Sequence, residues 1–273
     1  MTSNDMTNKG TGWDFLNQAV DAAPSRLGDV LLEHLTQAIV DGRFQPGDPL
    51  PPEGQLATAF KVSKPVAREA LRELAALGVV SVQQGKVSRV RAIDGAPLQR
   101  FYRLALGSGQ QRWLEAVQLR RILESPIARL AAQHRTESEL LELQGVLAAM
   151  DHARGHVERW IEADLEFHHL LARMTRNRLL VLQISGLQPL VRDMMQRFNA
   201  RQTQAGRNWD QTFERHLRIA VAIRASDAAA AEAAMDTHFG AAEKSVDEIF
   251  GATPGAAPTS SEPASAPHAD PLR

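Results

Sequence analysis

Four ionisable side chains in the second half of the sequence have the residue types and the spacing of a metal site: Asp164, His168, His216 and His238. Asp164 and His168 are four residues apart, so on a helix they project side by side. All four fall on apolar stripes, where an ionisable group is costly to bury without a partner. One carboxylate and three imidazoles suit a borderline divalent ion, with zinc preferred and nickel or manganese as alternatives. Such a site leaves coordination positions for water or a small anion.

Helices must position these side chains, because the surrounding apolar residues recur with helical period. Asp164 and His168 fall on the third of six expected helices, His216 on the fifth and His238 on the sixth. No strand pattern interrupts the series, so residues 111–250 are predicted to form an all-α antiparallel helix bundle. The six helices are expected over residues 111–134, 137–153, 156–175, 178–200, 209–225 and 227–250.

The first half of the chain has a different organisation, over residues 24–93. Ser63 is a suitable N-cap for the third helix of this part, and Gly78 is a suitable stop. The pattern predicts a winged helix-turn-helix, so the fold class is mainly α, with this domain ahead of the helix bundle. Its elements are expected as helices over residues 27–40, 53–60 and 64–77, and as strands over 79–82 and 87–93.

Basic residues are concentrated in the same region, although the formal net charge of the whole chain is only −1. Between Lys61 and Arg91 there are seven basic residues and two acidic ones. Lys64, Arg68 and Arg72 recur every four residues and therefore form one basic stripe on the third helix. A solvated basic face is the alternative to a surface that contacts phosphates.

Composition excludes several other classes of protein. There is no cysteine, which rules out disulfides, thiolate zinc sites and cysteine nucleophiles. No apolar run is long enough to span a bilayer, and the N-terminal residues do not read as a secretory signal, so we expect a soluble, cytoplasmic protein. Residues 94–110 are expected to be a linker, and residues 1–23 and 251–273 flexible tails.

The N-terminal motifs resemble those of the GntR family of bacterial transcription regulators. They are Pro46-Gly47-Asp48, Leu50-Pro51-Pro52-Glu53, Leu56-Ala57, Val62-Ser63-Lys64 and Arg68-Glu69-Ala70-Leu71. The resemblance implies DNA contacts from the recognition helix and from the tip of the wing. The expected DNA-binding residues are Lys64, Pro65, Val66, Arg68, Arg72, Gln84, Gly85 and Lys86.

Four residues depart from the family pattern. Gly54 stands where a basic residue is common, Lys64 where arginine is usual, and Pro65 and Val66 where threonines often contact phosphates. Lysine cannot form the two-pronged contact that arginine makes with guanine. The operator sequence of a relative therefore cannot be transferred to this chain.

The second half resembles the FCD effector-binding domain of the FadR-type branch of this family. The segment Arg120 to Glu124, the run Asp164-Leu165-Glu166-Phe167-His168, Asn177, His216 and His238 match its signatures. The resemblance implies that the four candidate ligands bind the metal and that Arg120 lies in the effector cavity beside it. An ion pair between Arg120 and Glu124 is the alternative, and Arg192 is a candidate second contact with the effector.

These features together predict a homodimeric repressor that binds a palindromic operator. A small organic acid at the metal site is expected to control its affinity for DNA, with the sign of that response left open. One alternative is a metal-dependent enzyme acting on a small carboxylate, although no general base is recognisable. Another is a DNA-architectural protein with a purely structural metal, which would show no dependence on an effector.

Overall fold

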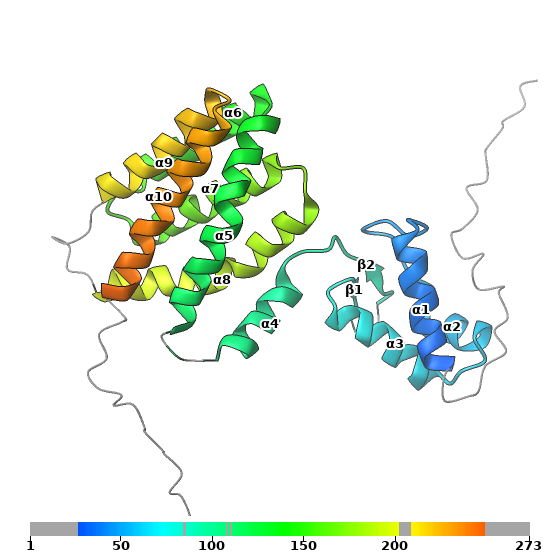
Figure 1. Ribbon diagram of the computed structural model, residues 1–273. Helices are drawn as coiled ribbons and strands as arrows, with labels where there is room; N and C mark the ends of the chain where they lie inside the picture. Colours follow the sequence, from blue (N-terminus) through cyan, green and yellow to red (C-terminus); the bar gives the residue numbers. More distant parts are fainter. Residues whose placement is uncertain (1–26, 84–85, 108, 110, 202–208, 249–273) are drawn as a thin grey trace, which may run out of the picture.

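The computed structural model describes residues 27–83, 86–107, 109, 111–201 and 209–248. Within these residues it shows a small N-terminal domain and a larger helical domain, with one helix between them (Figure 1). The fold class expected from the sequence is confirmed. None of the helices described combines the length and the apolar character that crossing a membrane requires.

The N-terminal domain is a winged helix-turn-helix. It consists of α1 (Leu27–Val40), α2 (Glu53–Ala59), α3 (Lys64–Ala76), β1 (Val80–Ser81) and β2 (Arg89–Val90). The Ser63 side chain caps α3 by accepting a hydrogen bond from the backbone N–H of Val66, as expected for this N-cap. The core lies between the helices, and leucine is its most frequent residue, including Leu31, Leu35 and Leu71.

The hairpin is shorter than the sequence predicts. Among the described residues, two residue pairs form the ladder, with Val80 opposite Val90 and Ser81 opposite Arg89. Val82 and Val87, which were expected to extend the strands, are 38% and 49% exposed and do not pack against the core. Valine favours strands, but these two valines have no core surface to pack against and therefore do not extend the sheet. Gln84 and Gly85 lie outside the described residues.

The segment expected to be a linker contains a helix, α4 (Ala96–Leu106), that the sequence pattern did not predict. Pro97 lies in the first turn of this helix, a position where proline is acceptable. The helix packs against α8 of the second domain. An isolated helix of this length is marginal in water, so the contact with α8 supports it, although none of its own residues is fully buried.

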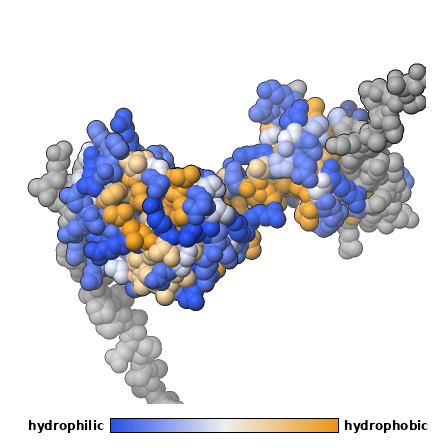
Figure 2. All heavy atoms as spheres, turned by 90° about the horizontal axis from the view of Figure 1, so that it is seen from above, coloured by the Kyte–Doolittle hydropathy of each residue, from blue (hydrophilic) through white to orange (hydrophobic). Residues whose placement is uncertain are grey.

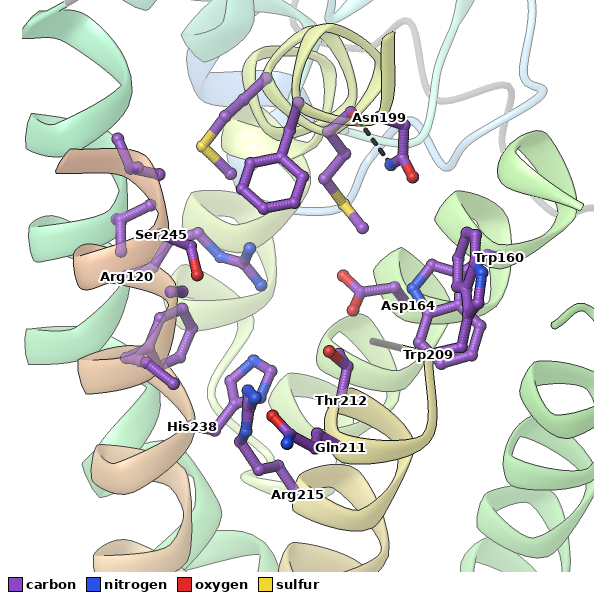
Figure 3. A pocket seen from close by; sticks show the side chains of 18 residues that line it. Arg120, Trp160, Asp164, Asn199, Trp209, Gln211, Thr212, Arg215, His238 and Ser245 are labelled. Atoms are coloured by element: carbon purple, nitrogen blue, oxygen red, sulfur yellow. Dashed lines mark hydrogen bonds between the residues drawn. The ribbon is translucent and has the colours of Figure 1, made fainter. Parts of the chain in front are cut away.

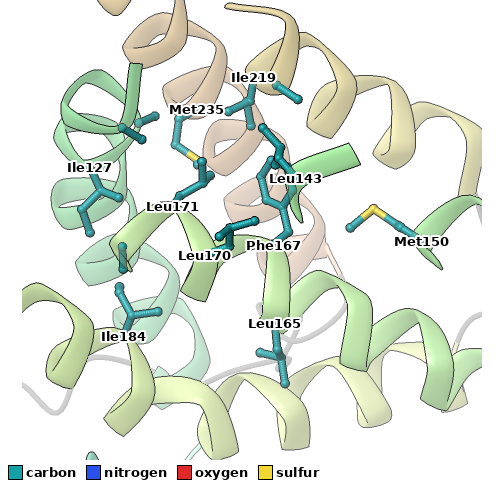
Figure 4. Packing of buried hydrophobic residues seen from close by; sticks show 14 of the residues in the cluster. Ile127, Leu143, Met150, Leu165, Phe167, Leu170, Leu171, Ile184, Ile219 and Met235 are labelled. Carbon is teal, nitrogen blue, oxygen red and sulfur yellow. The ribbon is translucent and has the colours of Figure 1, made fainter. Parts of the chain in front are cut away.

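The second domain is the expected all-α bundle. Its helices are α5 (Gln111–His134), α6 (Glu137–His152), α7 (Val157–Met174), α8 (Arg178–Arg201), α9 (Trp209–Arg224) and α10 (Ala228–Val246). Their bounds lie within a few residues of the prediction. α7 is the central helix, and Phe167, Leu170 and Leu171 on it are fully buried among side chains of the surrounding helices (Figure 4).

Ion pairs hold α10 against α5. Arg121 on α5 donates from Nε to Asp236 at 2.7 Å and from Nη1 to Glu243 at 2.8 Å. Through these hydrogen bonds and their charge, the two carboxylates raise the pKa of the Arg121 guanidinium. The two acids lie on either side of His238 in the sequence of α10, so the clamp positions the helix that carries this residue.

Candidate metal and effector site

The four predicted metal ligands come together inside the helical domain. Asp164 and His168 come from α7, His216 from α9 and His238 from α10. Their exposed fractions are 4%, 1%, 0% and 7%, in the same order. The apolar faces predicted from the sequence therefore do face the interior, and the four ionisable side chains are buried on those faces.

The three histidines form the tightest part of this cluster. One nitrogen from each of His168, His216 and His238 lies within 4.8 Å of the other two. Asp164 adjoins this group, with Oδ1 3.2 Å from Nε2 of His216 and Oδ2 4.0 Å from Nε2 of His168. Ligand atoms at these separations can share one divalent ion, because two atoms that are each about 2.1 Å from a tetrahedral metal lie about 3.4 Å from each other.

Three imidazole nitrogens in the cluster are buried without a hydrogen-bond partner among the described residues: Nε2 of His168, Nε2 of His216 and Nδ1 of His238. Leaving a buried polar group unpaired costs about 1–3 kcal/mol. A shared metal ion would satisfy all three nitrogens at once, so the residues present fit a divalent metal.

The electrostatic surroundings favour the protonation states that a metal requires. Burial lowers the pKa of His168 and lowers that of His238 further, so both imidazoles are neutral at neutral pH. Burial raises the pKa of Asp164, but its contact with His216 and the nearby positive groups outweigh this effect and leave the pKa below its usual value. Neutral imidazole and ionised carboxylate are the forms that coordinate metals.

Hydrogen bonds behind the cluster orient two of the imidazoles. Glu124 on α5 is completely buried and contacts Nδ1 of His168, which leaves Nε2 of that ring facing the cluster. Nδ1 of His216 lies 2.8 Å from the backbone oxygen of Thr212, so its Nε2 also faces inward. The sequence suggested Glu124 only as a partner of Arg120, because a contact between α5 and α7 has no local signature.

The role of Glu124 can be tested with an isosteric change. Glu124→Gln keeps an oxygen for His168 but removes the charge that strengthens this hydrogen bond and pairs with Arg120. We expect metal affinity to fall by about tenfold, at the lower end of the usual effect for such outer partners. Competition against a chromogenic chelator measures it. Glu115→Gln, a less buried position on the same helix, is the matched control, and equal affinities in the two variants would contradict the role.

A cavity of about 290 Å³ lies beside the cluster. Figure 3 shows Asp164, His238 and Arg120 on its walls, with Trp160 and Trp209 at one side. Its other polar lining residues are Asn199, Gln211, Thr212, Arg215 and Ser245. These polar groups share the lining with apolar and aromatic side chains, as in sites for small molecules.

Arg120 forms the internal ion pair that the sequence offered as an alternative, and it also lines the cavity. Its Nε donates to Glu124, so the internal ion pair is present. The same side chain lines the cavity and is only 5% exposed, with its guanidinium 5.0 Å from the centre of the Phe239 ring. Because the ion pair uses Nε, the Nη groups are placed to meet a ligand.

Arg192 does not have the surroundings expected of an effector contact. Its two Nη atoms donate to the carboxylate of Glu162 at 2.7 and 2.9 Å, and the residue does not line the cavity. The cavity arginine that sequence reasoning missed is Arg215 on α9. Its position directly before His216 was the available signal, but the rotation of α9 in the bundle decides which neighbours of His216 face the cavity.

The predicted DNA-binding residues form a second surface, on the N-terminal domain. A groove of about 850 Å³ lies between α3, the start of α2 and the hairpin. Lys64, Arg68, Arg72 and Lys86 line it, and all four are exposed. Pro65 and Val66 are exposed at the start of α3 but do not line the groove, and the wing-tip residues Gln84 and Gly85 lie outside the described residues.

Glu53 orients one of these basic side chains. It accepts hydrogen bonds from Arg68 at 3.0 Å to Nε and 2.8 Å to Nη2, a two-pronged contact across 15 residues of sequence. The hydrogen bond from Arg68 holds the pKa of Glu53 below its usual value. The pairing gives Arg68 a defined direction above the recognition helix, which the sequence did not predict.

Two known families match separate segments of the chain, and these segments correspond to the two domains of the structure. Residues 27–90 match the bacterial regulatory proteins of the gntR family, and residues 115–241 match the FCD domain. These two segments contain the basic groove and the buried cluster, respectively.

Curated relatives match across most of the chain. The HTH-type transcriptional regulator LutR of Bacillus subtilis is 31% identical over 206 residues, which are 74% of this chain and 92% of that protein. The galactonate operon transcriptional repressor of Escherichia coli is 28% identical, over 81% of this chain and 97% of that protein. The transcriptional repressor NanR of Cronobacter sakazakii is also 28% identical, over 80% and 84%.

A solved structure agrees with the fold. The chain described as Streptococcus agalactiae GntR superposes with a TM-score of 0.65 at 23% sequence identity, covering 80% of this chain and 99% of that one. At this level of identity the likeness supports the fold, and the function depends on the sites and the sequence relatives.

Proposed function

This chain belongs to the GntR family of bacterial regulatory proteins and carries an FCD domain, and we propose that it is a repressor controlled by a small organic acid at a metal site. It is a DNA-binding transcriptional regulator, and its relatives carry the names of regulators and repressors rather than of enzymes. We expect it to act in the cytoplasm, where bacterial DNA lies.

The proposal for a metal rests on one observation above the others. Three buried imidazole nitrogens converge next to a buried carboxylate, and none of the three has a hydrogen-bond partner in the described part of the chain. Asp164, His168, His216 and His238 would hold the ion, with zinc preferred over nickel or manganese. When bound, it would offer open coordination positions to an oxygen of the acid.

An acid fits the cavity better than a neutral or a long-chain ligand. Arg120 offers its guanidinium beside the proposed metal, an arrangement suited to a carboxylate. A space of about 290 Å³ lies at the lower limit for ligand pockets and is too small for a long acyl chain. Galactonate, which appears in the name of one relative, is an organic acid of this general kind.

A homodimer would match the two half-sites of a palindromic operator. On α4 the side chains of Phe101 and Leu104 are 64% and 79% exposed. Figure 2 shows apolar surface on the segment that joins the two domains as well as on the helical domain. We propose that a second copy of the chain covers the exposed face of α4, because large apolar side chains are costly to leave in water.

Contacts between α8 and α4 offer a route from the cavity to the DNA-binding domain. α8 carries Met194 and Phe198, which line the cavity, and Gly186, which lies against Gly95 at the start of α4. Tyr102 on α4 donates a hydrogen bond to Gln183 on α8. An acid that moves α8 would therefore move α4 with it, and the domain attached to α4 would follow.

The function is tested with purified full-length protein prepared with and without zinc. A DNA site is selected from a randomised duplex pool, and binding is measured across a panel of small hydroxy, keto and sugar acids. We expect at least one acid to stabilise the zinc-loaded protein against heat and to change its affinity for the selected site. Stabilisation without any change in DNA affinity would leave a DNA-architectural protein with a structural metal as the better description.

A separate prediction tests whether the contact of Gly186 with α4 couples acid binding to DNA binding. A methyl group at this position would lie 2.7 Å from Cβ of Leu98 and 3.3 Å from the ring of Tyr102, so Gly186→Ala should push α4 away from α8. We expect metal and acid binding to persist while the acid loses most of its effect on DNA affinity. Gly145→Ala is the control, because a methyl group there meets nothing within 4 Å. Full coupling in both variants would rule out this route.

A further inference from the structure

Arg215 is a cation in the cavity that no acidic side chain neutralises within the described part of the chain. It lies on α9 and lines the cavity, and it is partly buried. Its guanidinium forms no ion pair with a carboxylate of the described residues, and Arg218, three residues further along α9, is a second basic side chain. An arginine stays protonated at neutral pH, so its charge is available to a ligand.

Two other arginines of the helical domain, Arg120 and Arg192, are already paired. Arg120 donates to Glu124, and Arg192 donates to Glu162 outside the cavity. Desolvating a charged group is unfavourable unless a partner compensates for it. Arg215 therefore has the features of a binding group whose partner is brought in from solution.

The cavity has two separate places for negative charge. Asp164, His238 and Arg120 form the metal end, and Arg215 reaches in from α9 at the lower side of the view in Figure 3. In this view Arg215 lies below His238, whereas Arg120 and Asp164 lie above it. Gln211 and Thr212 line the wall one turn earlier on α9.

The positive charges that line the cavity also favour a ligand with two negative charges. The Arg120–Glu124 pair is neutral, and a divalent ion beside Asp164 leaves one positive charge at the metal end. Arg215 adds a second positive charge. A ligand with one carboxylate would leave one of these charges uncompensated in a partly enclosed space, whereas a dianion would neutralise both.

We propose that the effector is a small dicarboxylic acid. One carboxylate binds at the metal end beside Arg120, and Arg215 binds the second carboxylate. The inference rests on the proposed function, since it assumes an acid at the metal site, and it adds the class of acid and the residue that selects it.

The test compares acids that differ only in the second carboxylate. Binding of malate and 2-hydroxybutyrate, of succinate and butyrate, and of 2-oxoglutarate and 2-oxopentanoate is measured by calorimetry on zinc-loaded, full-length protein. We expect the preferred dicarboxylate to bind about ten- to a hundredfold more tightly than its partner. Arg215→Gln should remove this preference by weakening the dicarboxylate alone.

Arg218→Gln is the matched control, since this exposed arginine lies one turn further along α9 and does not line the cavity. It should keep the preference, and Arg215→Lys should keep part of it. Equal binding of both members of every pair to wild-type protein, or equal weakening of both by Arg215→Gln, would overturn the inference and leave the acid-controlled function standing. Failure of every acid to bind would overturn both.

Discussion

Replacing His216 by alanine is expected to remove the metal ion, lower the melting temperature and abolish the response of DNA binding to any acid. Protein isolated without a polyhistidine tag should carry about one divalent ion per chain, and the variant should carry almost none. His216 is fully buried and lies 3.2 Å from Asp164, so its loss opens the centre of the cluster. A ligand at a hundred times its dissociation constant stabilises the folded state by about 2.7 kcal/mol.

The measurements are elemental analysis and thermal unfolding. Alanine also leaves a cavity next to Phe167, whose ring centre is 4.8 Å from that of His216, so part of the destabilisation is independent of the metal. Treating wild-type protein with a chelator separates the two effects. His169→Ala, at a less buried histidine next to His168, is the control and should retain the ion. A wild-type protein that contains no metal and takes up none from zinc, nickel or manganese would refute the site.

The pH dependence of the metal-free protein follows from the same cluster. Burial lowers the pKa values of His168 and His238 in the folded state, whereas the same two imidazoles have a pKa of about 6.5 in the unfolded chain. Below that pH the unfolded chain binds more protons than the folded protein. The folded state therefore loses stability as the pH falls through this range, and metal affinity falls with it because protons compete for the same nitrogens.

Arg68→Ala is expected to abolish specific DNA binding while leaving the fold intact. The side chain is exposed on α3, lines the basic groove and is held in place by Glu53. Loss of a good base or phosphate contact costs about 1–3 kcal/mol at each half-site, and a dimer would lose it twice. The variant also leaves Glu53 facing the DNA without its partner, which adds repulsion from the phosphates.

Gel-shift or fluorescence-anisotropy titration on the selected site measures the loss, and circular dichroism checks the fold. Arg43→Ala is the control, because this arginine is also exposed on the N-terminal domain but lies outside the groove. Unchanged affinity in the Arg68 variant would mean that α3 is not the helix that reads the DNA.

Structural features that depend on residues close together in the sequence could be predicted from the sequence alone. Hydrophobic periodicity located the helices of the bundle, and the N-cap Ser63 marked the start of α3. Asp164, His168, His216 and His238 could be identified from their positions alone, because an ionisable group on an apolar stripe must enter the core with its helix. The two-domain organisation and the family followed from motifs that are continuous in the sequence.

Only the tertiary structure decided how different helices face one another. Glu124 and His168 are 44 residues apart, and Glu53 and Arg68 are 15 apart, so neither pairing has a local signal. Successive residues on a helix point about 100° apart, so a small uncertainty in the rotation of α8 or α9 changes which arginine reaches the cavity. α4 as a whole could not be predicted from its own sequence either, because the surface against which it packs belongs to α8.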